Sequence, residues 1–392
     1  MTTFKVLTLN NISERGLSRF PRDRYQVATD IGEPDAIMLR SADMHAVVIP
    51  ESVKAVGRAG AGTNNVPVAA MSKRGIPVFN APGANANAVK ELVIAALLLS
   101  ARNICEAWAY VRGLEGDDHA LELAVEKGKK QFVGQELPGR VLGVIGLGAI
   151  GVEVANAAHD LGMRVVGFDP DLTVHRALQL SSGVERTLSL DDLFARADMV
   201  TVHVPLVDGT RKLVNAARLR LMRPGGTVVN FSRAGIVDVA AVIGALDAGT
   251  LARYVCDFPT NAIKEHPKVV ALPHLGASTH EAEENCAIMV TDALREMLEH
   301  GNIRNSVNFP EAVLPRTPGA SRMSVVNENV PNMVGQVSTA LAAANLNIAN
   351  LLNKSRGDLA YALIDIDGQI PESMLTTLRA IPGVLSVRRV GA

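Results

Sequence analysis

The chain has 392 residues, of which 39 are lysine or arginine and 40 are aspartate or glutamate, so its formal net charge is −1. Apolar residues make up 48% and charged residues 20%, a globular composition that argues against extensive disorder. The near-zero charge excludes a broadly basic nucleic-acid or membrane binder, although a local group of cations remains compatible with it. The length predicts two or three domains.

The three cysteines, Cys105, Cys256 and Cys286, lie far apart and form no CxxC pair. They cannot build a dense disulfide framework, so we expect a protein of the reducing cytoplasm. The first residues lack the pattern of a secretory signal, and no apolar stretch reaches the roughly 18 residues of a membrane span. The histidines show no metal-binding spacing, so we predict no metal site. The balanced charge and the absence of a membrane-span stretch predict no nucleic-acid partner and no membrane partner.

Residues 1–97 form a first block in which short apolar segments alternate with polar loops. The segments with the length and β-branched content of strands are Val6–Leu9, Ala36–Leu39, Ala46–Ile49 and Pro77–Phe79. Lys90–Arg102 is apolar on most faces, which is typical of a buried helix. Arg58–Asn65 is a glycine-bearing loop whose backbone N–H groups could approach an anion.

Residues 98–280 repeat strand–helix units. The predicted strands are Val141–Ile145, Arg164–Phe168, Met199–Val204, Thr227–Phe231, Tyr254–Cys256 and Val269–Leu272. Such alternation predicts a parallel sheet that helices cover on both faces.

The last part of the chain begins with a proline-rich segment, residues 309–320, which we predict to be a linker. Beyond it, residues 321–392 predict a β-α-β-β-α-β order, with strands near Met323–Val326, Ile348–Asn353, Leu359–Ile366 and Val384–Val390, and helices over Met333–Ala344 and Glu372–Arg379. That order is the ferredoxin-like unit, for which about 70 residues suffice.

A glycine-rich turn follows the first strand of the second block. Gly146, Gly148 and Gly151 have GxGxxG spacing and open a predicted helix, which is where a dinucleotide pyrophosphate binds. Asp169 ends the next strand, where a carboxylate accepts hydrogen bonds from the adenosine ribose. Asp169 would repel a 2′-phosphate and no arginine follows it directly, so NAD is predicted as cofactor in preference to NADP.

Polar residues also follow other strands, at the edge where open α/β sheets bind ligands. Arg233 could hold a carboxylate through its planar fork, and His274 could exchange a proton with an alcohol while hydride moves. His203 is equally compatible with a structural role, and Arg233 alone with a surface ion pair.

Six motifs together resemble the D-2-hydroxyacid dehydrogenases in order and spacing: Arg58–Asn65, Asn80–Leu92, Gly146–Gly151, Val202–Leu206, Asn230–Gly235 and Pro273–Thr279. The resemblance implies a flavodoxin-like substrate domain (1–97 and 281–308) into which a Rossmann-type NAD domain (98–280) is inserted, with the active site in the cleft between them. It implies oxidation of 3-phospho-D-glycerate by NAD in L-serine synthesis. The alternatives are a hydroxypyruvate or glyoxylate reductase, and a non-catalytic NAD sensor.

The resemblance also implies roles for individual residues. Arg233 would bind the substrate carboxylate and His274 would act as acid and base. Cofactor contacts would come from Gly146, Gly148, Ala149, Ile150, Gly151, Asp169, His203, Pro205, Asp257 and Gly276, of which Asp257 would contact the nicotinamide carboxamide. Substrate contacts would come from Arg40, Ser41, Ala61, Gly62 and Lys90.

One expected residue is absent. Family members carry a glutamate that supports the catalytic histidine, but the matching place holds Asn261 or Ala262. Glu265 is near in sequence, and the role is not transferred to it. We therefore predict a dyad of Arg233 and His274.

Residues 321–392 resemble an ACT domain, a small-molecule sensor of amino-acid biosynthetic enzymes. Asn327, Asn329 and Asn347 fall at its ligand-binding positions, which implies an amino-acid effector such as serine. However, Asn327 replaces the histidine of serine-responsive members, so a domain kept only for oligomerisation is an equal alternative. The family suggests a homodimer or homotetramer.

Overall fold

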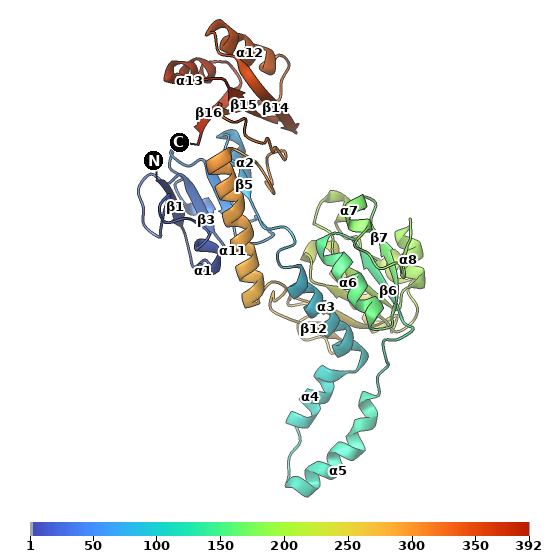
Figure 1. Cartoon of the computed structure of the whole chain (residues 1–392). Coiled ribbons are helices and arrows are strands. Elements are labelled where there is room, and N and C mark those ends of the chain that lie inside the picture. Colours follow the sequence, from blue (N-terminus) through green and yellow to red (C-terminus); the bar gives the residue numbers. More distant parts are fainter. Residues whose placement is uncertain (1–2, 392) are drawn as a thin grey trace. The chain divides into compact units, whose positions relative to one another are not determined.

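The computed structural model describes residues 3–391 and divides into two compact units (Figure 1). The first unit contains the chain up to Asn85 and again from His280 onward, and the second is Ala86–Thr279. The first unit is therefore discontinuous in sequence.

A five-stranded parallel sheet forms the first part of the first unit, in the order β2-β1-β3-β4-β5. Its strands are β1 (Phe4–Thr8), β2 (Tyr25–Ala28), β3 (Ala36–Leu39), β4 (Ala55–Arg58) and β5 (Val78–Phe79). The order is that of flavodoxin-like sheets, as predicted. The helices of this part are α1 (Glu14–Leu17), α2 (Val68–Lys73) and α11 (His280–Arg295), followed by the π-helical turn η5 (Glu296–His300).

The returning helix α11 packs closely on this sheet and on α1 because a glycine in β4 and one in α1 allow it. A Cβ on Gly57 would lie 2.5 Å from Val290, and one on Gly16 would lie 2.4 Å from Ala287. Val290 and Ala287 belong to the same buried core as the strand residues. The segment after the inserted unit thus completes the core that the segment before it begins.

The predicted strand over Ala46–Ile49 is wrong. The structure has a short 3₁₀ turn, η1 (Met44–Ala46), followed by irregular chain, and Val48 is 91% exposed. The place beside β3 is filled by β4, which pairs with it in parallel register from Ala36 against Ala55. A β-branched run therefore stayed outside the sheet because a buried run further along took its position.

The second unit is a seven-stranded parallel sheet in the order β12-β11-β10-β9-β6-β7-β8, which confirms the predicted Rossmann-type architecture. Its strands are β6 (Val141–Ile145), β7 (Arg164–Phe168), β8 (Val184–Arg186), β9 (Met199–Val202), β10 (Gly226–Asn230), β11 (Leu251–Cys256) and β12 (Val269–Ala271). Its helices are α3 (Ala86–Ala101), α6 (Ala149–Asp160), α7 (Val174–Ala177), α8 (Leu190–Arg196), α9 (Ala216–Leu219) and α10 (Val239–Asp247), with the 3₁₀ turns η3 (Asp208–Thr210) and η4 (Ala234–Ile236).

A helical hairpin leaves this unit between α3 and β6 (Figure 1). It consists of α4 (Ile104–Arg112), α5 (Asp118–Gly128) and the 3₁₀ turn η2 (Lys129–Phe132). The Tyr110 hydroxyl donates a hydrogen bond to the carbonyl oxygen of Ala124, 2.9 Å away, and so joins the two helices. Trp108 and Leu123 are 63% and 60% exposed, so the hairpin carries apolar surface that the chain itself does not cover.

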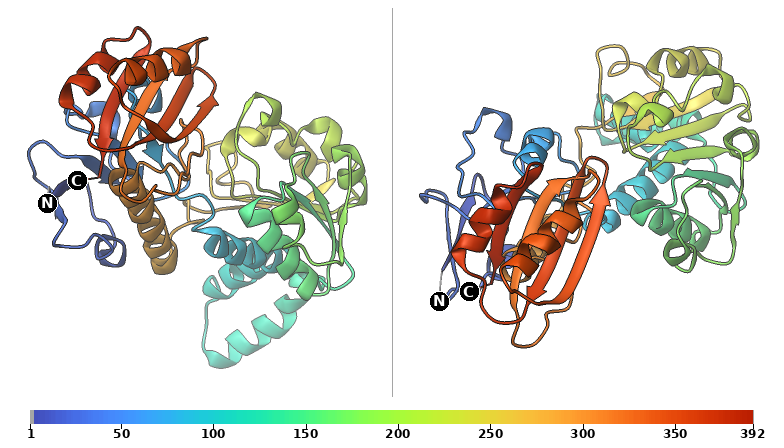
Figure 2. Two further views of the ribbon diagram at one scale, coloured as in Figure 1. Left: turned by 45° about the horizontal axis from the view of Figure 1, so that its top comes forward. Right: turned by 90° about the horizontal axis from the view of Figure 1, so that it is seen from above.

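The C-terminal part of the first unit is an antiparallel sheet in the order β14-β15-β13-β16, the predicted ferredoxin-like arrangement. Its strands are β13 (Ser321–Glu328), β14 (Ile348–Arg356), β15 (Leu359–Ile366) and β16 (Val384–Val390). The helices α12 (Met333–Ala343) and α13 (Glu372–Arg379) cover one face of it (Figure 2).

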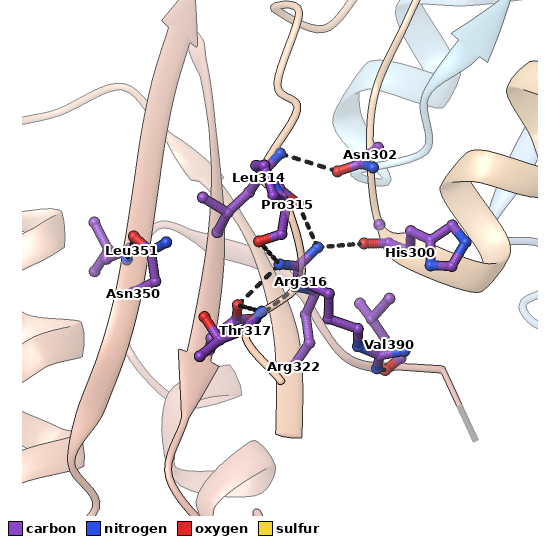
Figure 3. A network of polar contacts seen from close by, with 12 residues as sticks. His300, Asn302, Leu314, Pro315, Arg316, Thr317, Arg322, Asn350, Leu351 and Val390 are labelled. Carbon is purple, nitrogen blue, oxygen red and sulfur yellow. Dashed lines mark hydrogen bonds and ion pairs between the residues drawn. The ribbon is translucent and has the colours of Figure 1, made fainter. Parts of the chain in front are cut away.

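The proline-rich segment before β13 is held by one buried arginine (Figure 3). Arg322 donates hydrogen bonds to the carbonyl oxygens of His300, Leu314 and Pro315 at 2.8–3.1 Å, and pairs with Asp365 at 2.6 Å. Both charged side chains are fully buried. Because every guanidinium nitrogen has an acceptor, the desolvation cost of the pair is offset.

Candidate active site

The turn between β6 and α6 has the geometry of a phosphate-binding loop. Gly146 has φ = +90°, and a Cβ on Gly151 would lie 1.8 Å from the carbonyl oxygen of Gly146. A Cβ on Gly148 would meet no atom within 4 Å, so Gly148 leaves open space in front of the helix. The backbone N–H groups of Ala149 and Ile150 open α6 at this point. The turn can therefore accept a pyrophosphate.

Asp169, directly after β7, is fixed against this turn. Its Oδ2 accepts a hydrogen bond from the backbone N–H of Leu147 at 2.8 Å, and Oδ1 accepts one from Asp171 at 2.9 Å. The guanidinium of Arg186 donates to the carbonyl oxygen of Asp169 at 3.2 Å. Arg186 was not predicted as part of this site, because it comes from the next strand, β8. The carboxylate is therefore held beside the glycine turn, where a ribose-binding group is expected.

His203 and Pro205 follow β9, the neighbour of β6 on the other side of the turn. The ring of His203 lies 3.0 Å from the hydroxyl of Thr201, and burial lowers the pKa of His203 to about 3. The backbone oxygen of His203 would lie 2.7 Å from a Cβ on Gly146, so the two segments are in close contact. A neutral His203 supports the turn and does not supply a proton at neutral pH.

Arg233 is presented by the loop after β10. Buried Asn230 holds this loop: its side chain donates to the carbonyl oxygen of Arg233 at 3.0 Å and accepts from the backbone N–H of Ser232 at 3.1 Å. The Arg233 side chain is exposed, and it donates to the carbonyl oxygen of Ser232 at 2.7 Å. Among the described residues no salt bridge includes Arg233, so its fork is available to an anion.

Asp257 ends the neighbouring strand β11 and is 1% exposed. Within residues 3–391, neither of its carboxylate oxygens has a hydrogen-bond partner of good geometry, and the backbone N–H groups of Gly276 and of Asp257 itself act on it only weakly. Burial raises the pKa of Asp257, although the positive charges of His274 and Arg233 oppose this shift. A Cβ on Gly276 would lie 3.6 Å from Oδ2, so only a small residue fits there. A buried carboxylate whose oxygens are not saturated by the protein can accept a hydrogen bond from a ligand N–H group.

His274 follows β12, the next strand in the sheet, and its ring is exposed. It packs edge-on against Phe258, with ring centroids 5.0 Å apart. Arg233, Asp257 and His274 thus come from the carboxyl ends of three adjacent strands and are close enough for their charges to interact. Sequence reasoning selected these three residues, and the fold brings them together.

The segment where the family's glutamate was expected contains no carboxylate next to His274. Asn261 and Ala262 are exposed, and Ile263 is buried. The side chain of Glu265 is 86% exposed and lies 3.7 Å from Lys264. Asp257 is an acidic group near His274, whose positive charge opposes the rise in the pKa of Asp257.

In the first unit, Arg40 and Ser41 follow β3. Asn10 fixes both: its Oδ1 accepts from the Arg40 backbone N–H at 2.9 Å, and its Nδ2 donates to the Ser41 hydroxyl at 3.1 Å. The Arg40 guanidinium pairs with Glu283 of α11 at 2.6 Å. The sequence did not reveal Asn10 or Glu283, because both come from distant segments.

The glycine-bearing loop follows β4, the strand next to β3. Ala61 accepts a hydrogen bond from the side chain of Asn80 at 2.6 Å, and both Ala61 and Gly62 are half-buried. A Cβ on Gly60 would lie 1.8 Å from the guanidinium of Arg58, so this cation lies under the loop. Arg58 is a further candidate substrate-binding residue, which the sequence motif contains only as the first residue of the loop.

Arg58 and Arg40 lie on the same side of this sheet. Burial raises the pKa of Cys286 in α11, and the charges of Arg58 and Arg40 both oppose that shift. Two arginines therefore gather at the carboxyl ends of β3 and β4. Lys90 belongs to α3 in the second unit, where its ammonium donates to the side chain of Asn87.

The three asparagines of the C-terminal sheet do not meet in one copy. Strand register aligns Ser321 with Ile366 and Ile366 with Ile348, so Asn347, which precedes β14, lies at the end where β13 begins. Asn327 and Asn329 lie at the other end of β13. Their side chains donate to the carbonyl oxygens of Glu328 and Gly357, whereas Asn347 donates to Asp367. A single ligand contacting all three requires a second copy.

Within residues 3–391, no group of three His, Cys, Asp or Glu side chains is arranged to hold a metal ion. No single helix in that range has the length and hydropathy to cross a membrane, although the bent pair α3 and α4 meets the criteria jointly.

Comparison with known proteins gives a consistent result. Residues 94–280 match the family model of the D-isomer specific 2-hydroxyacid dehydrogenase NAD-binding domain. The chain is 33% identical to D-3-phosphoglycerate dehydrogenase of Haemophilus influenzae over 85% of this chain and 80% of that protein. It is 34% identical to the enzyme of the same name from Escherichia coli K12, over 86% and 82%.

Solved structures agree on the fold. The holo form of D-mandelate dehydrogenase from Rhodotorula graminis superposes with a TM-score of 0.68 at 25% identity, over 80% of this chain and all of that chain. NAD-bound 3-phosphoglycerate dehydrogenase from Entamoeba histolytica gives a TM-score of 0.60 at 22% identity, over 78% and 99%.

Proposed function

Because the chain belongs to the D-2-hydroxyacid dehydrogenases, which are NAD-dependent, we propose that it oxidises 3-phospho-D-glycerate to 3-phosphohydroxypyruvate. The observation that carries the proposal is the convergence of Arg233, Asp257 and His274 on adjacent strand ends of the NAD-binding unit. The choice of substrate is supported by relatives named D-3-phosphoglycerate dehydrogenase.

The residues present fit NAD. The open turn at Gly148 suits the pyrophosphate, and the oriented carboxylate of Asp169 suits the adenosine ribose. The carboxylate of Asp257, whose oxygens are not saturated by the protein, suits a carboxamide N–H₂ donor. When bound there, the nicotinamide supplies the hydride acceptor.

In the proposed reaction, Arg233 binds the substrate carboxylate bidentately and keeps the reacting carbon oriented. A ring nitrogen of His274 takes the proton of the 2-hydroxyl group as the C–H bond at that carbon breaks. The resulting imidazolium would be stabilised by the negative charge of Asp257, whose own pKa responds to the charge of His274. This assigns to Asp257 part of the role of the absent glutamate.

The groups of the first unit are proposed to bind the rest of the substrate. Backbone N–H groups of the Ala61–Gly62 loop would contact the carboxylate, and Ser41 would line the same edge of the sheet. Arg40 would contact the phosphate, which requires its guanidinium to be shared with or released from Glu283. Lys90 is a further proposed substrate contact from α3.

The product, a phosphorylated 2-keto acid, fits the first step of the phosphorylated route to L-serine. The C-terminal sheet, which has the order of an ACT domain, is proposed to bind an amino acid or to join copies. The exposed apolar surface of the α4–α5 hairpin supports a homodimer or homotetramer.

The test is a substrate panel followed by absorbance at the NADH band. Purified protein is expected to reduce NAD with 3-phospho-D-glycerate, and His274→Ala is expected to lose about 10²–10⁴-fold in kcat. Reduction of glyoxylate or hydroxypyruvate with no turnover of 3-phosphoglycerate would favour the reductase alternative. Tight NAD binding without any turnover would favour the sensor. Repeating the panel with L-serine tests the effector.

A further inference from the structure

The C-terminal sheet has two buried faces. Along β13 and β15, residues of one set, such as Val325, pack against α12 and α13. The alternate residues face the five-stranded sheet β1–β5 and its helices, which we call the first sheet domain. Of the second set, Tyr361 donates a hydrogen bond to the carbonyl oxygen of Gly301 at 2.6 Å and packs edge-on against Phe309. The sheet is therefore docked on the rest of the first unit by its second face.

Arg388 of β16 lies on this docking face. It pairs in register with Ser324, whereas its neighbour Val387 points to the helices. Its Nη1 donates to the carbonyl oxygen of Lys54 at 3.0 Å, across the junction. Its Nη2 is buried and has no hydrogen-bond partner among the described residues.

The charge of Arg388 is not neutralised by the protein. Two neighbouring cations have carboxylate partners: Arg322 pairs with Asp365, and Lys54 pairs with Asp35 at 2.6 Å. Among the ion pairs of residues 3–391, none includes Arg388. Burial lowers the pKa of Arg388, and the charge of Tyr361 opposes that shift. A buried guanidinium with an unused N–H group is costly unless an anion accompanies it.

A cavity of about 210 Å³ opens next to this guanidinium. Lys54, Ser324 and Arg388 line its polar side, and Phe4 and Met297 line its apolar side. No aspartate or glutamate is among its lining residues. The volume lies below the range of about 300–1,000 Å³ typical of sites for drug-sized ligands, so the cavity suits a molecule of a few heavy atoms.

The cavity is separate from the proposed substrate groups. Phe4 begins β1 and Lys54 immediately precedes β4, so the cavity lies at the amino ends of these parallel strands. Arg40 and Arg58 lie at the carboxyl ends of β3 and β4, the opposite edge of the same sheet. A ligand in the cavity therefore does not compete with the substrate for Arg40.

We propose that this cavity binds a small oxyanion, through a carboxylate or phosphate group held by Arg388, and that the bound anion fastens the C-terminal sheet to the first sheet domain. A guanidinium fork matches either group with two parallel hydrogen bonds. Because Arg388 belongs to the C-terminal sheet and Lys54 to the other part, an anion between them links the two. The neighbouring Arg322 network keeps the junction ordered without it (Figure 3).

The test is calorimetric titration of the full chain with sodium phosphate and, separately, with sodium acetate, at an ionic strength held constant with sodium chloride. The wild-type protein is expected to bind at least one of the two, and the pair of titrations tells phosphate from carboxylate preference. Arg388→Met is expected to weaken that binding at least tenfold. Anion binding at Arg40 or Arg233 would persist in the variant, so the difference between the proteins reports the cavity.

Two further variants keep the result interpretable. Arg356→Gln removes another arginine that crosses the junction, where it donates to the carbonyl oxygen of Ser306 at 3.1 Å, but it does not line the cavity and is expected to retain wild-type affinity. Arg388→Lys keeps the charge without the fork and is expected to bind with intermediate affinity. In chloride, Arg388→Met is expected to melt at or above the wild-type temperature. Equal anion affinity of wild type and Arg388→Met, or no binding by the wild type, would overturn the proposal.

Discussion

Asp257→Asn is expected to stabilise the NAD-free protein while impairing the reaction. The wild-type carboxylate is 1% exposed and has no side-chain hydrogen-bond donor among the described residues. The charges of His274 and Arg233 and the backbone N–H group of Gly276 offset only part of its desolvation, because its pKa is still raised. Asparagine has nearly the same shape and carries no charge. The substitution therefore removes a buried charge and opens no cavity.

The size of the effect follows from the desolvation cost of one unpaired buried group, about 1–3 kcal/mol. For a domain of this size, 1 kcal/mol shifts the melting temperature by roughly 2–4 °C. Because burial raises the pKa of Asp257, the wild type loses stability as the pH rises from the unfolded-state pKa through the folded-state pKa. The advantage of Asp257→Asn should be full at pH 8 and should disappear below about pH 4.

Thermal melts of both proteins between pH 3.5 and 8 measure this difference in stability. Steady-state rates at pH 8 measure the predicted loss of activity. Asparagine can still accept a hydrogen bond from a carboxamide, but it cannot stabilise the His274 imidazolium, so kcat/KM should fall by about tenfold or more. A variant that melts below the wild type at pH 8, or that keeps full kcat/KM, would refute this account of Asp257.

Three other predictions concern the turn, the cofactor and the linker. Gly148→Ala should melt like the wild type, because the added Cβ meets only open space, but it should lose NAD affinity in a fluorescence titration. Gly151→Ala should lose NAD affinity and also melt at a lower temperature. Equal melting temperatures of the two variants would contradict the assignment. Asp169→Ser should raise kcat/KM with NADP relative to NAD by about tenfold or more, and an unchanged ratio would remove Asp169 from the ribose site. Arg322→Met should lower the free energy of unfolding of the first unit by about 3–5 kcal/mol in urea, since Asp365 stays buried without its partner; a change below 1 kcal/mol would contradict this.

The pattern of apolar residues predicted most strands of the seven-stranded sheet, but it missed β8 there and both β2 and β4 of the five-stranded sheet. The limits of Val141–Ile145 and Arg164–Phe168 agree with the structure to the residue, because a glycine or a polar turn ends each run. The strand predicted over Ala46–Ile49 is absent, because segments compete for a place in the sheet and β4 occupies the position beside β3. The α4–α5 hairpin had no predicted limits, because its apolar residues face outward and its helices lack a strong buried stripe.

The site was predictable where its residues follow strands in parallel register. Arg233, Asp257 and His274 could be selected because the ends of β10, β11 and β12 share one edge. The ion pair of Arg40 with Glu283 could not be selected, because it joins residues that only the return of α11 brings together. Arg388 could not be predicted as a binding residue for a similar reason, because its burial results from the docking of the C-terminal sheet on the first sheet domain.

The most direct measurement is the ratio of kcat/KM for 3-phospho-D-glycerate to that for D-glycerate, with NAD, in the wild type and in Arg40→Gln. The two substrates differ only in the phosphate. We predict a wild-type ratio well above one that falls sharply in Arg40→Gln, with the D-glycerate rate little changed. A wild-type ratio of one or less would contradict the proposal that this dehydrogenase acts on the phosphorylated acid.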